Sequence, residues 1–146
     1  MVTENIRYVG VNDHEIDLFE GQYAVPQGMA YNSYVILDEK IAVMDTVDAR
    51  FGAQWLENIA AAPRRRGQNR PAAVIGRREP SYLVVQHMEP DHSANIQRFL
   101  ERYPGAALVG NAKTFVMLDQ FFPELPRAAR LTVKDGEELF LGAHTL

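Results

Sequence analysis

Four side chains that can bind a metal fall within the stretch Gln86–Ser93. They are His87, Glu89, Asp91 and His92. Two imidazoles and two carboxylates form a nitrogen–oxygen ligand set with substantial negative charge, which suits iron or manganese and also permits zinc. Two carboxylates held close together in a partly buried loop repel each other, so their proximity is costly without a cation. The residue types in this stretch therefore favour a metal site.

The proline in the middle of the stretch determines how these side chains can be placed. Pro90 disfavours helical dihedrals at Glu89, so the chain from His87 to Glu89 is expected to be extended and a helix to begin near Asp91 or later. Side chains two positions apart in an extended segment point to the same side, so His87, Glu89 and Asp91 are predicted to converge on one small volume. The alternative is a polar surface turn in which Asp91 or Ser93 caps the helix and the histidines are solvated.

The apolar pattern on either side predicts that this stretch joins a strand to a helix. Tyr82–Gln86 is predicted to be a strand, and a helix from about Ser93 is expected to end at Pro104. Upstream, Tyr31–Leu37 and Ile41–Asp45 have the pattern of a hairpin whose second strand is buried on both faces. Strand ends are a usual location for functional sites in α/β sheets, so the placement supports the metal hypothesis.

The other apolar runs complete the predicted fold. A helix is expected to start after an N-cap at Asp48 and to end at Pro63. The order of elements predicts a mixed α/β layered domain with a largely buried sheet. The remaining predicted elements are a strand over Asn5–Val11, a strand over Ala106–Val109, a helix over Lys113–Phe122, and a hairpin of Leu131–Val133 and Leu139–Leu141 around a turn at 134–137.

Length and composition exclude several kinds of site. The chain has 146 residues, which suits one domain, and it has no cysteine, which excludes disulfides, zinc–thiolate sites, iron–sulfur ligation and a cysteine nucleophile. The net charge of −4 provides no general basic field for nucleic acid. The arginine-rich stretch 64–78 is interpreted as a solvated connector rather than an anion- or partner-binding loop, because no aromatic residue is interleaved.

The sequence also predicts where the protein works. The first residues, 1–7, contain no apolar segment of the kind found in a secretory signal. The longest uncharged run, Gly21–Leu37, contains too many polar residues to suit a membrane span. A cytoplasmic protein without a membrane partner is therefore expected.

The motif His-x-Glu-x-Asp-His at 87–92, following a Val-Val strand, resembles the metal motif of the flavodiiron proteins, also called A-type flavoproteins. It is a variant of the His-x-His-x-Asp-His motif of metallo-β-lactamase-fold hydrolases, with Glu89 in place of the second histidine. The resemblance covers nearly the whole chain and includes the runs 17–23, 31–37, 42–47 and 110–115.

The resemblance implies a fold and an activity. The chain would be the N-terminal portion of a four-layer αββα sandwich that holds two non-haem irons and reduces O2 to water or NO to N2O. Electrons would arrive through FMN on a C-terminal flavodoxin-like domain, often from rubredoxin. His87 and Glu89 would bind one iron, and Asp91 would bind the other with His92 beside it. A zinc hydrolase is an alternative that Glu89 disfavours, because a carboxylate weakens the Lewis acidity of the ion.

The resemblance also predicts an incomplete site. Residues 1–146 are expected to form a single partial metallo-β-lactamase-like domain, because the family's third histidine, bridging aspartate, later histidine and flavodoxin-like domain match nothing in the sequence. The alternative is a catalytically incomplete fragment or remnant with weak or no metal binding. A sheet face without its cover predicts a homo-oligomer or a complementing segment. His14 and His144 are expected to be exposed. Asp45 is expected to have a strand-end or turn role, and the alternative is that it contacts a metal ligand without binding the metal itself.

Overall fold

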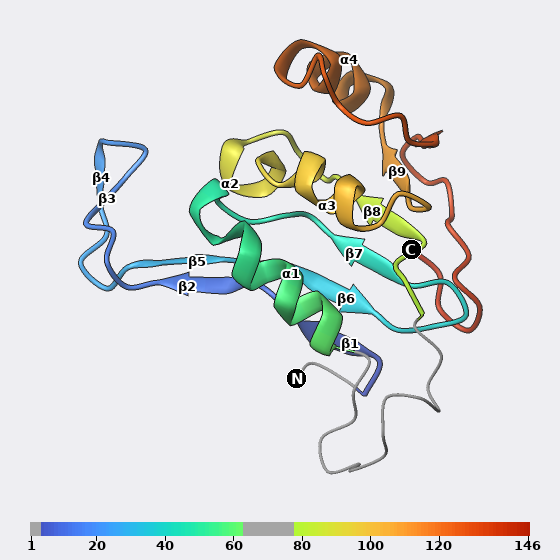
Figure 1. The fold of residues 1–146 in the computed structure, drawn as a ribbon, viewed down its shortest axis with the longest axis horizontal. Helices are drawn as coiled ribbons and strands as arrows, with labels where there is room; N and C mark the ends of the chain where they lie inside the picture. Colours follow the sequence, from blue (N-terminus) through green and yellow to red (C-terminus); the bar gives the residue numbers. More distant parts are fainter. Residues whose placement is uncertain (1–3, 63–77) are drawn as a thin grey trace.

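The structure, a computed structural model, describes residues 4–62 and 78–146, and it centres on one mixed six-stranded sheet (Figure 1). Except for Arg78, the arginine-rich stretch lies outside the described residues. The first three strands are antiparallel, and the last four run parallel to one another. In spatial order the strands are β1 (Ile6–Tyr8), β6 (Tyr34–Ile36), β7 (Ala42–Met44), β8 (Tyr82–Val84), β9 (Ala107–Gly110) and β10 (Arg130–Thr132).

Side chains cap the 3-10 turn that precedes the first helix and the last helix. Asp48 accepts a hydrogen bond from the backbone amide of Arg50 and so caps the 3-10 turn η1 (Ala49–Phe51), which leads into α1 (Gly52–Ala61). Asn111 caps α4 (Ala112–Phe121) by accepting from the amide of Thr114. The predicted cap at Asp48 is therefore confirmed, one turn ahead of the α-helix itself.

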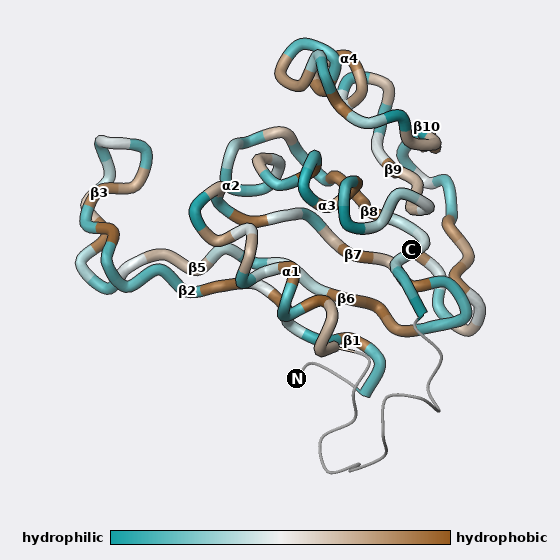
Figure 2. The backbone as a smooth tube through the Cα atoms, viewed as in Figure 1, coloured by the Kyte–Doolittle hydropathy of each residue, from teal (hydrophilic) through white to brown (hydrophobic). Residues whose placement is uncertain are grey.

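One face of the sheet packs against three helices. The side chains of Val35, Val43 and Leu83 point toward α1, α3 (Ile96–Arg102) and α4 and join their apolar residues in the main core. Figure 2 shows the hydrophobic residues concentrated along the central strands. Among the largest buried side chains of this core are Trp55, Phe99, Leu100 and Leu118.

The opposite face of the sheet has a different and thinner cover. Side chains alternate along a strand, so Ile36, Ala42 and Val84 point away from the helices. Leu141, from the C-terminal segment, packs on Ile36 and Ala42 and is itself buried. The uncovered area expected from the sequence is thus reduced, but Met44 and Val84 remain only partly buried.

A narrow ribbon extends from the sheet beyond the helices (Figure 1). It consists of β2 (Val11–Asp13) paired with β5 (Met29–Tyr31), and it carries β3 (Leu18–Phe19) and β4 (Tyr23–Ala24) at its tip. The buried carboxylate of Asp13 anchors the ribbon to η1 through an ion pair of 2.6 Å with Arg50.

Two sequence predictions about strands are wrong in part. Asn5–Val11 is divided between β1 and β2, because the chain leaves the main sheet at Gly10, where a Cβ atom would lie 2.2 Å from the carbonyl oxygen of Tyr31. The predicted hairpin near residues 131–141 does not form. Its first half pairs with β9 as a parallel strand, and Leu139 and Leu141 instead bond back to Leu146 and His144. The turn at 134–137 is present, but it does not join two paired strands.

Candidate metal centre

The metal-competent stretch follows β8, at the end of the sheet where the parallel strands β7 and β8 terminate. Glu89 is extended, with φ −62° and ψ 145°, and Pro90 is the first residue of the short helix α2 (Pro90–Ser93). The Ser93 hydroxyl lies within hydrogen-bonding distance of the carbonyls of Met88 and Glu89 and so fixes the turn. The predicted break from extended chain to helix at Pro90 is therefore confirmed.

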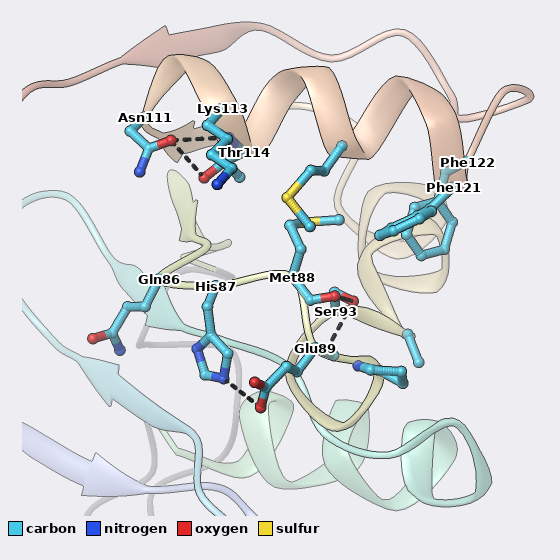
Figure 3. A pocket seen from close by; sticks show the side chains of 13 residues that line it. Gln86, His87, Met88, Glu89, Ser93, Asn111, Lys113, Thr114, Phe121 and Phe122 are labelled. Carbon is cyan, nitrogen blue, oxygen red and sulfur yellow. Dashed lines mark hydrogen bonds and ion pairs between the residues drawn. The ribbon is translucent and has the colours of Figure 1, made fainter.

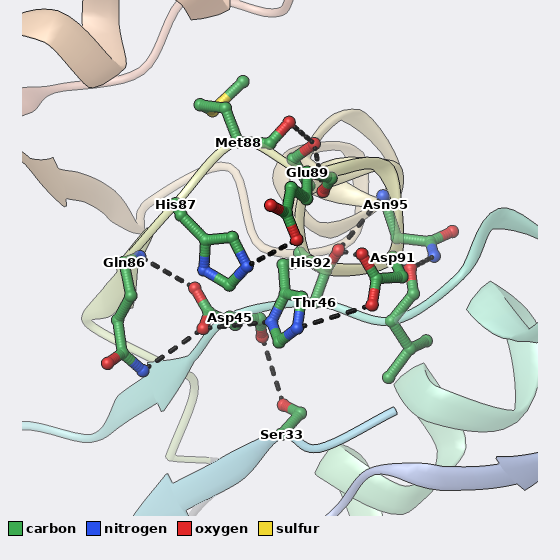
Figure 4. Close-up of polar contacts among 12 residues, drawn as sticks. Ser33, Asp45, Thr46, Gln86, His87, Met88, Glu89, Asp91, His92 and Asn95 are labelled. Carbon is green, nitrogen blue, oxygen red and sulfur yellow. Dashed lines mark hydrogen bonds and ion pairs between the residues drawn. The ribbon is translucent and has the colours of Figure 1, made fainter. Parts of the chain in front are cut away.

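The four predicted site residues gather in two contact pairs (Figure 4). The Nε2 atom of His87 lies 3.4 Å from Oε2 of Glu89, and Nε2 of His92 lies 3.5 Å from Oδ2 of Asp91. The two imidazole rings join the pairs, with their centroids 4.0 Å apart. Two donors that share an ion at about 2.1 Å each are themselves about 3.0–3.5 Å apart, so both pairs have a separation that fits metal ligation.

The pair of Asp91 and His92 is more buried than the pair of His87 and Glu89. Asp91 is 8% exposed and its neighbour His92 is half-buried, whereas Glu89 is exposed. Neither Asp91 nor Ser93 is the N-cap residue of α2, because that position is Glu89, which makes no side-chain cap bond. The surface-turn alternative is therefore wrong about the cap and about the solvation of His92.

Asp45 belongs to this cluster, although the sequence suggested mainly a strand-end role. Among the described residues, the metal-competent group whose donor atoms all lie within 4.8 Å of one another is Asp45, His87 and His92. Asp45 does follow β7, and it is buried with a positive φ of 55°. The available signal was its position one strand away from the motif, since β7 and β8 are parallel neighbours that end at the same edge.

The electrostatics of the cluster favour a cation. The hydrogen bond between His92 and Asp45, together with the charges of Asp45, Asp91 and Glu89, raises the pKa of His92, against the opposing effect of burial. A site that stabilises a proton on an imidazole among three carboxylates also stabilises a bound metal ion. The donor set and its charge therefore fit a non-haem iron.

A groove of about 690 Å³ opens beside the exposed half of the cluster (Figure 3). His87 and Glu89 line one side of it, and apolar side chains from α4 and its end line the other. These apolar side chains are Met117, Phe121 and Phe122. The groove gives small molecules a route to the two side chains that the sequence predicts as ligands of one iron.

The two other histidines lie outside the cluster. His14 is exposed, as predicted. The prediction that His144 is exposed is wrong, because its side chain is half-buried and its Nδ1 lies 2.6 Å from Oδ2 of Asp38. This contact fastens the C-terminal segment to the turn between β6 and β7, which explains the burial.

Comparison with known proteins finds relatives of this chain in sequence. No protein-family model matches the chain. The chain is 31% identical, over 144 residues, to the anaerobic nitric oxide reductase flavorubredoxin of Pectobacterium atrosepticum, which covers 97% of this chain and 25% of that protein. The curated relatives that it matches are several times longer, since it spans 19–27% of their length. No helix among the described residues is long and apolar enough to cross a membrane.

Two solved structures are similar to the whole fold. The flavodiiron protein from Giardia intestinalis and the rubredoxin oxygen:oxidoreductase from Desulfovibrio gigas each have a TM-score of 0.82 and 28% identity, and each match covers 99% of this chain. The chain covers 32% and 33% of those chains, respectively. By sequence and by fold, this chain therefore belongs with the flavodiiron proteins and has the architecture of their metallo-β-lactamase-like domain.

Proposed function

We propose that this chain provides part of the non-haem diiron centre of an oxygen or nitric oxide reductase. The observation that carries the proposal is the contact of two imidazoles with two carboxylates at the ends of β7 and β8. The names of two relatives, a nitric oxide reductase flavorubredoxin and a rubredoxin oxygen:oxidoreductase, support the class of reaction. Bound iron would supply the electrons and the Lewis acidity that reduction of a small oxide needs.

The protein's own residues would divide the work of holding the metal. His87 and Glu89 would bind one iron from the open side of the cluster, next to the groove. Asp91 would bind the other from the buried side, with His92 beside it. The apolar wall of the groove would reduce water access to the site while admitting a small uncharged substrate.

A zinc hydrolase is the alternative function, and Glu89 argues against it. The carboxylate of Glu89 lies 3.4 Å from His87, in the place where a hydrolase would have a neutral imidazole. A negatively charged ligand lowers the Lewis acidity that activates water and stabilises the oxidised state of iron. Iron is therefore the metal that the donor set supports better.

The proposal extends to the partners of the reaction. Electrons would come through FMN on a flavodoxin-like domain, supplied by a rubredoxin-type donor, and the remaining iron ligands would come from residues beyond this sequence or from another copy. Residues 1–146 would then be a single partial domain. A chain that binds little or no metal is the competing outcome.

Metal analysis tests the proposal. The chain is incubated anaerobically with Fe(II), freed of loosely bound metal, and analysed for iron per chain. We expect bound iron in the wild type and a loss of affinity of about tenfold or more in His87→Ala and Glu89→Ala. The matched control is His14→Ala, which removes an exposed histidine outside the cluster. Equal iron contents in all four proteins, or none in the wild type, would contradict the proposal.

A further inference from the structure

We propose that Asp45 is a positioning residue that holds His92 as the tautomer protonated on Nδ1, so that Nε2 is free to bind metal. This inference rests on the proposed function and names the role of one further residue in it. Oδ2 of Asp45 lies 3.2 Å from Nδ1 of His92, and Nε2 of the same ring points toward Asp91 (Figure 4). A carboxylate only accepts hydrogen bonds, so the neutral ring must carry its proton on Nδ1 and keep its lone pair on Nε2.

The contacts of Asp45 show why it acts through His92 rather than as a ligand. Its Oδ1 accepts a hydrogen bond of 2.7 Å from the backbone amide of Gln86, and its Oδ2 accepts one of 3.2 Å from the Gln86 side chain. With the contact to His92, both carboxylate oxygens have hydrogen-bond partners within the protein. Asp45 is therefore already satisfied without a metal.

The backbone of Asp45 is held in a conformation that few residues adopt. Its φ of 55° is uncommon for any residue other than glycine, and aspartate and asparagine tolerate it best. Its amide donates to the carbonyl of Val84, and its carbonyl accepts from the hydroxyl of Ser33, which in turn accepts from Nε1 of Trp55. The side chain is thus aimed from a rigid, buried support.

The same strand end also fixes the main chain of His92. The amide of Thr46 donates to the carbonyl of His92 over 2.8 Å. Two consecutive residues after β7, Asp45 and Thr46, therefore determine both the ring orientation and the backbone position of one proposed ligand. An arrangement that fixes the orientation of a metal-binding imidazole through its other nitrogen is a general feature of metal sites.

The first test measures the tautomer directly, without metal. Nitrogen-15 NMR of the full chain, at a pH high enough to keep His92 neutral, identifies which ring nitrogen carries the proton. We expect the Nδ1–H tautomer in the wild type. In Asp45→Asn, the amide can keep the bond to Gln86 while presenting its NH2 group to His92, so we expect the Nε2–H tautomer. An Nε2–H tautomer in the wild type, or no change in the variant, would overturn the proposal.

The second test uses Co²⁺ as a spectroscopic probe of the metal site. We expect Asp45→Asn to weaken Co²⁺ binding by about 10- to 100-fold, and to have no further effect in a His92→Ala background, because the positioning residue would then have nothing to position. A loss that persists in that background would show that Asp45 acts independently of His92 and would overturn the proposal. A wild type that binds no Co²⁺ but shows the expected tautomers would instead contradict the proposed function alone.

Discussion

The ring of His92 lies between two carboxylates, Asp45 at Nδ1 and Asp91 at Nε2, and this placement makes it the central side chain of the cluster. Asp45 orients the ring, and Asp91 lies next to the ring nitrogen that would bind a metal. An imidazole alone on the surface would have neither contact. The chemistry of the site therefore depends on Asp45, which follows β7, as much as on the motif that follows β8.

Trp55 supports the site from the core, and its removal has a predictable cost. It is fully buried, and its Nε1 donates to the Ser33 hydroxyl over 2.9 Å. Replacement by phenylalanine leaves that hydroxyl without its donor and leaves a small void, so we expect a loss of about 1–3 kcal/mol in the free energy of unfolding, measured in urea. If the bond is responsible, Trp55→Phe will cost clearly less in a Ser33→Ala background. Equal costs in both backgrounds would attribute the loss to packing alone.

The contact between Asp38 and His144 predicts a pH dependence of stability. The hydrogen bond from His144 and those from nearby backbone amides hold the pKa of Asp38 well below its ordinary value of 3.8. A carboxyl whose pKa is depressed by folding contributes stability above its unfolded pKa and loses that contribution as the pH falls through the folded value. We therefore expect the chain to lose stability below about pH 4.

Melting temperatures of wild type and Asp38→Asn across this acid range measure the effect. The variant should be less stable than the wild type near neutral pH, and the difference should shrink as the pH falls. Asp135→Asn, at an exposed turn, is the control and should follow the wild type. A constant difference in melting temperature between wild type and Asp38→Asn at all pH values would contradict this role of Asp38.

At the scale of elements, the sequence predicts best where a local rule acts alone. The extended chain before Pro90 and the helix after it follow from the geometry of proline, and the strands β7 and β8 follow from their apolar runs. The prediction for 131–141 is wrong because the apolar residues of this stretch fit a local hairpin as well as they fit a strand that pairs with β9. Pairing with β9 is a long-range choice that the local pattern does not contain.

In the candidate site, too, the sequence predicts the local features and misses the long-range ones. His87, Glu89, Asp91 and His92 are close in sequence, so their spacing predicts their proximity. Asp45 is 47 residues from His92, and its place in the cluster depends on the parallel pairing of β7 with β8. The sequence also did not predict which donors come closest together, because Asp45, and not Glu89 or Asp91, completes the close group with His87 and His92.

Gly28 lies in the ribbon just before β5, at a position that only glycine suits. Gly28 has φ 82°, and a Cβ atom there would lie 2.0 Å from the carbonyl oxygen of Asp13. We expect Gly28→Ala to reduce the free energy of unfolding by at least about 1–3 kcal/mol, since both the dihedral and the contact oppose a side chain. Gly105→Ala is the matched control, because a Cβ there meets nothing within 4 Å. Equal urea midpoints for the two variants would refute this role of Gly28.

At the scale of the whole molecule, the two faces of the sheet are unequally covered. Three helices bury one face, whereas Leu139 and Leu141 cover only part of the other. Met44, Tyr82 and Val84 remain partly buried on that second face. A contiguous apolar area of this kind marks an interaction surface, so we expect the 146-residue chain to self-associate.

Sedimentation velocity over a range of concentrations tests this expectation. Tyr82→Lys places a charge on the thinly covered face and should shift the chain toward monomer. Val116→Lys places the same charge on the exposed side of α4 and should leave the distribution unchanged. A wild type that sediments as a monomer at every concentration and binds no hydrophobic dye would contradict the prediction.

X-ray absorption at the iron edge of the Fe(II)-loaded chain tests most directly whether the cluster after β8 binds iron. We expect iron surrounded by nitrogen and oxygen donors, with the outer-shell scattering that imidazole rings produce. We also expect His87→Ala to remove part of that scattering and His14→Ala to leave it unchanged. Iron with oxygen donors only, or a spectrum that His87→Ala leaves unchanged, would show that the cluster after β8 does not bind the metal.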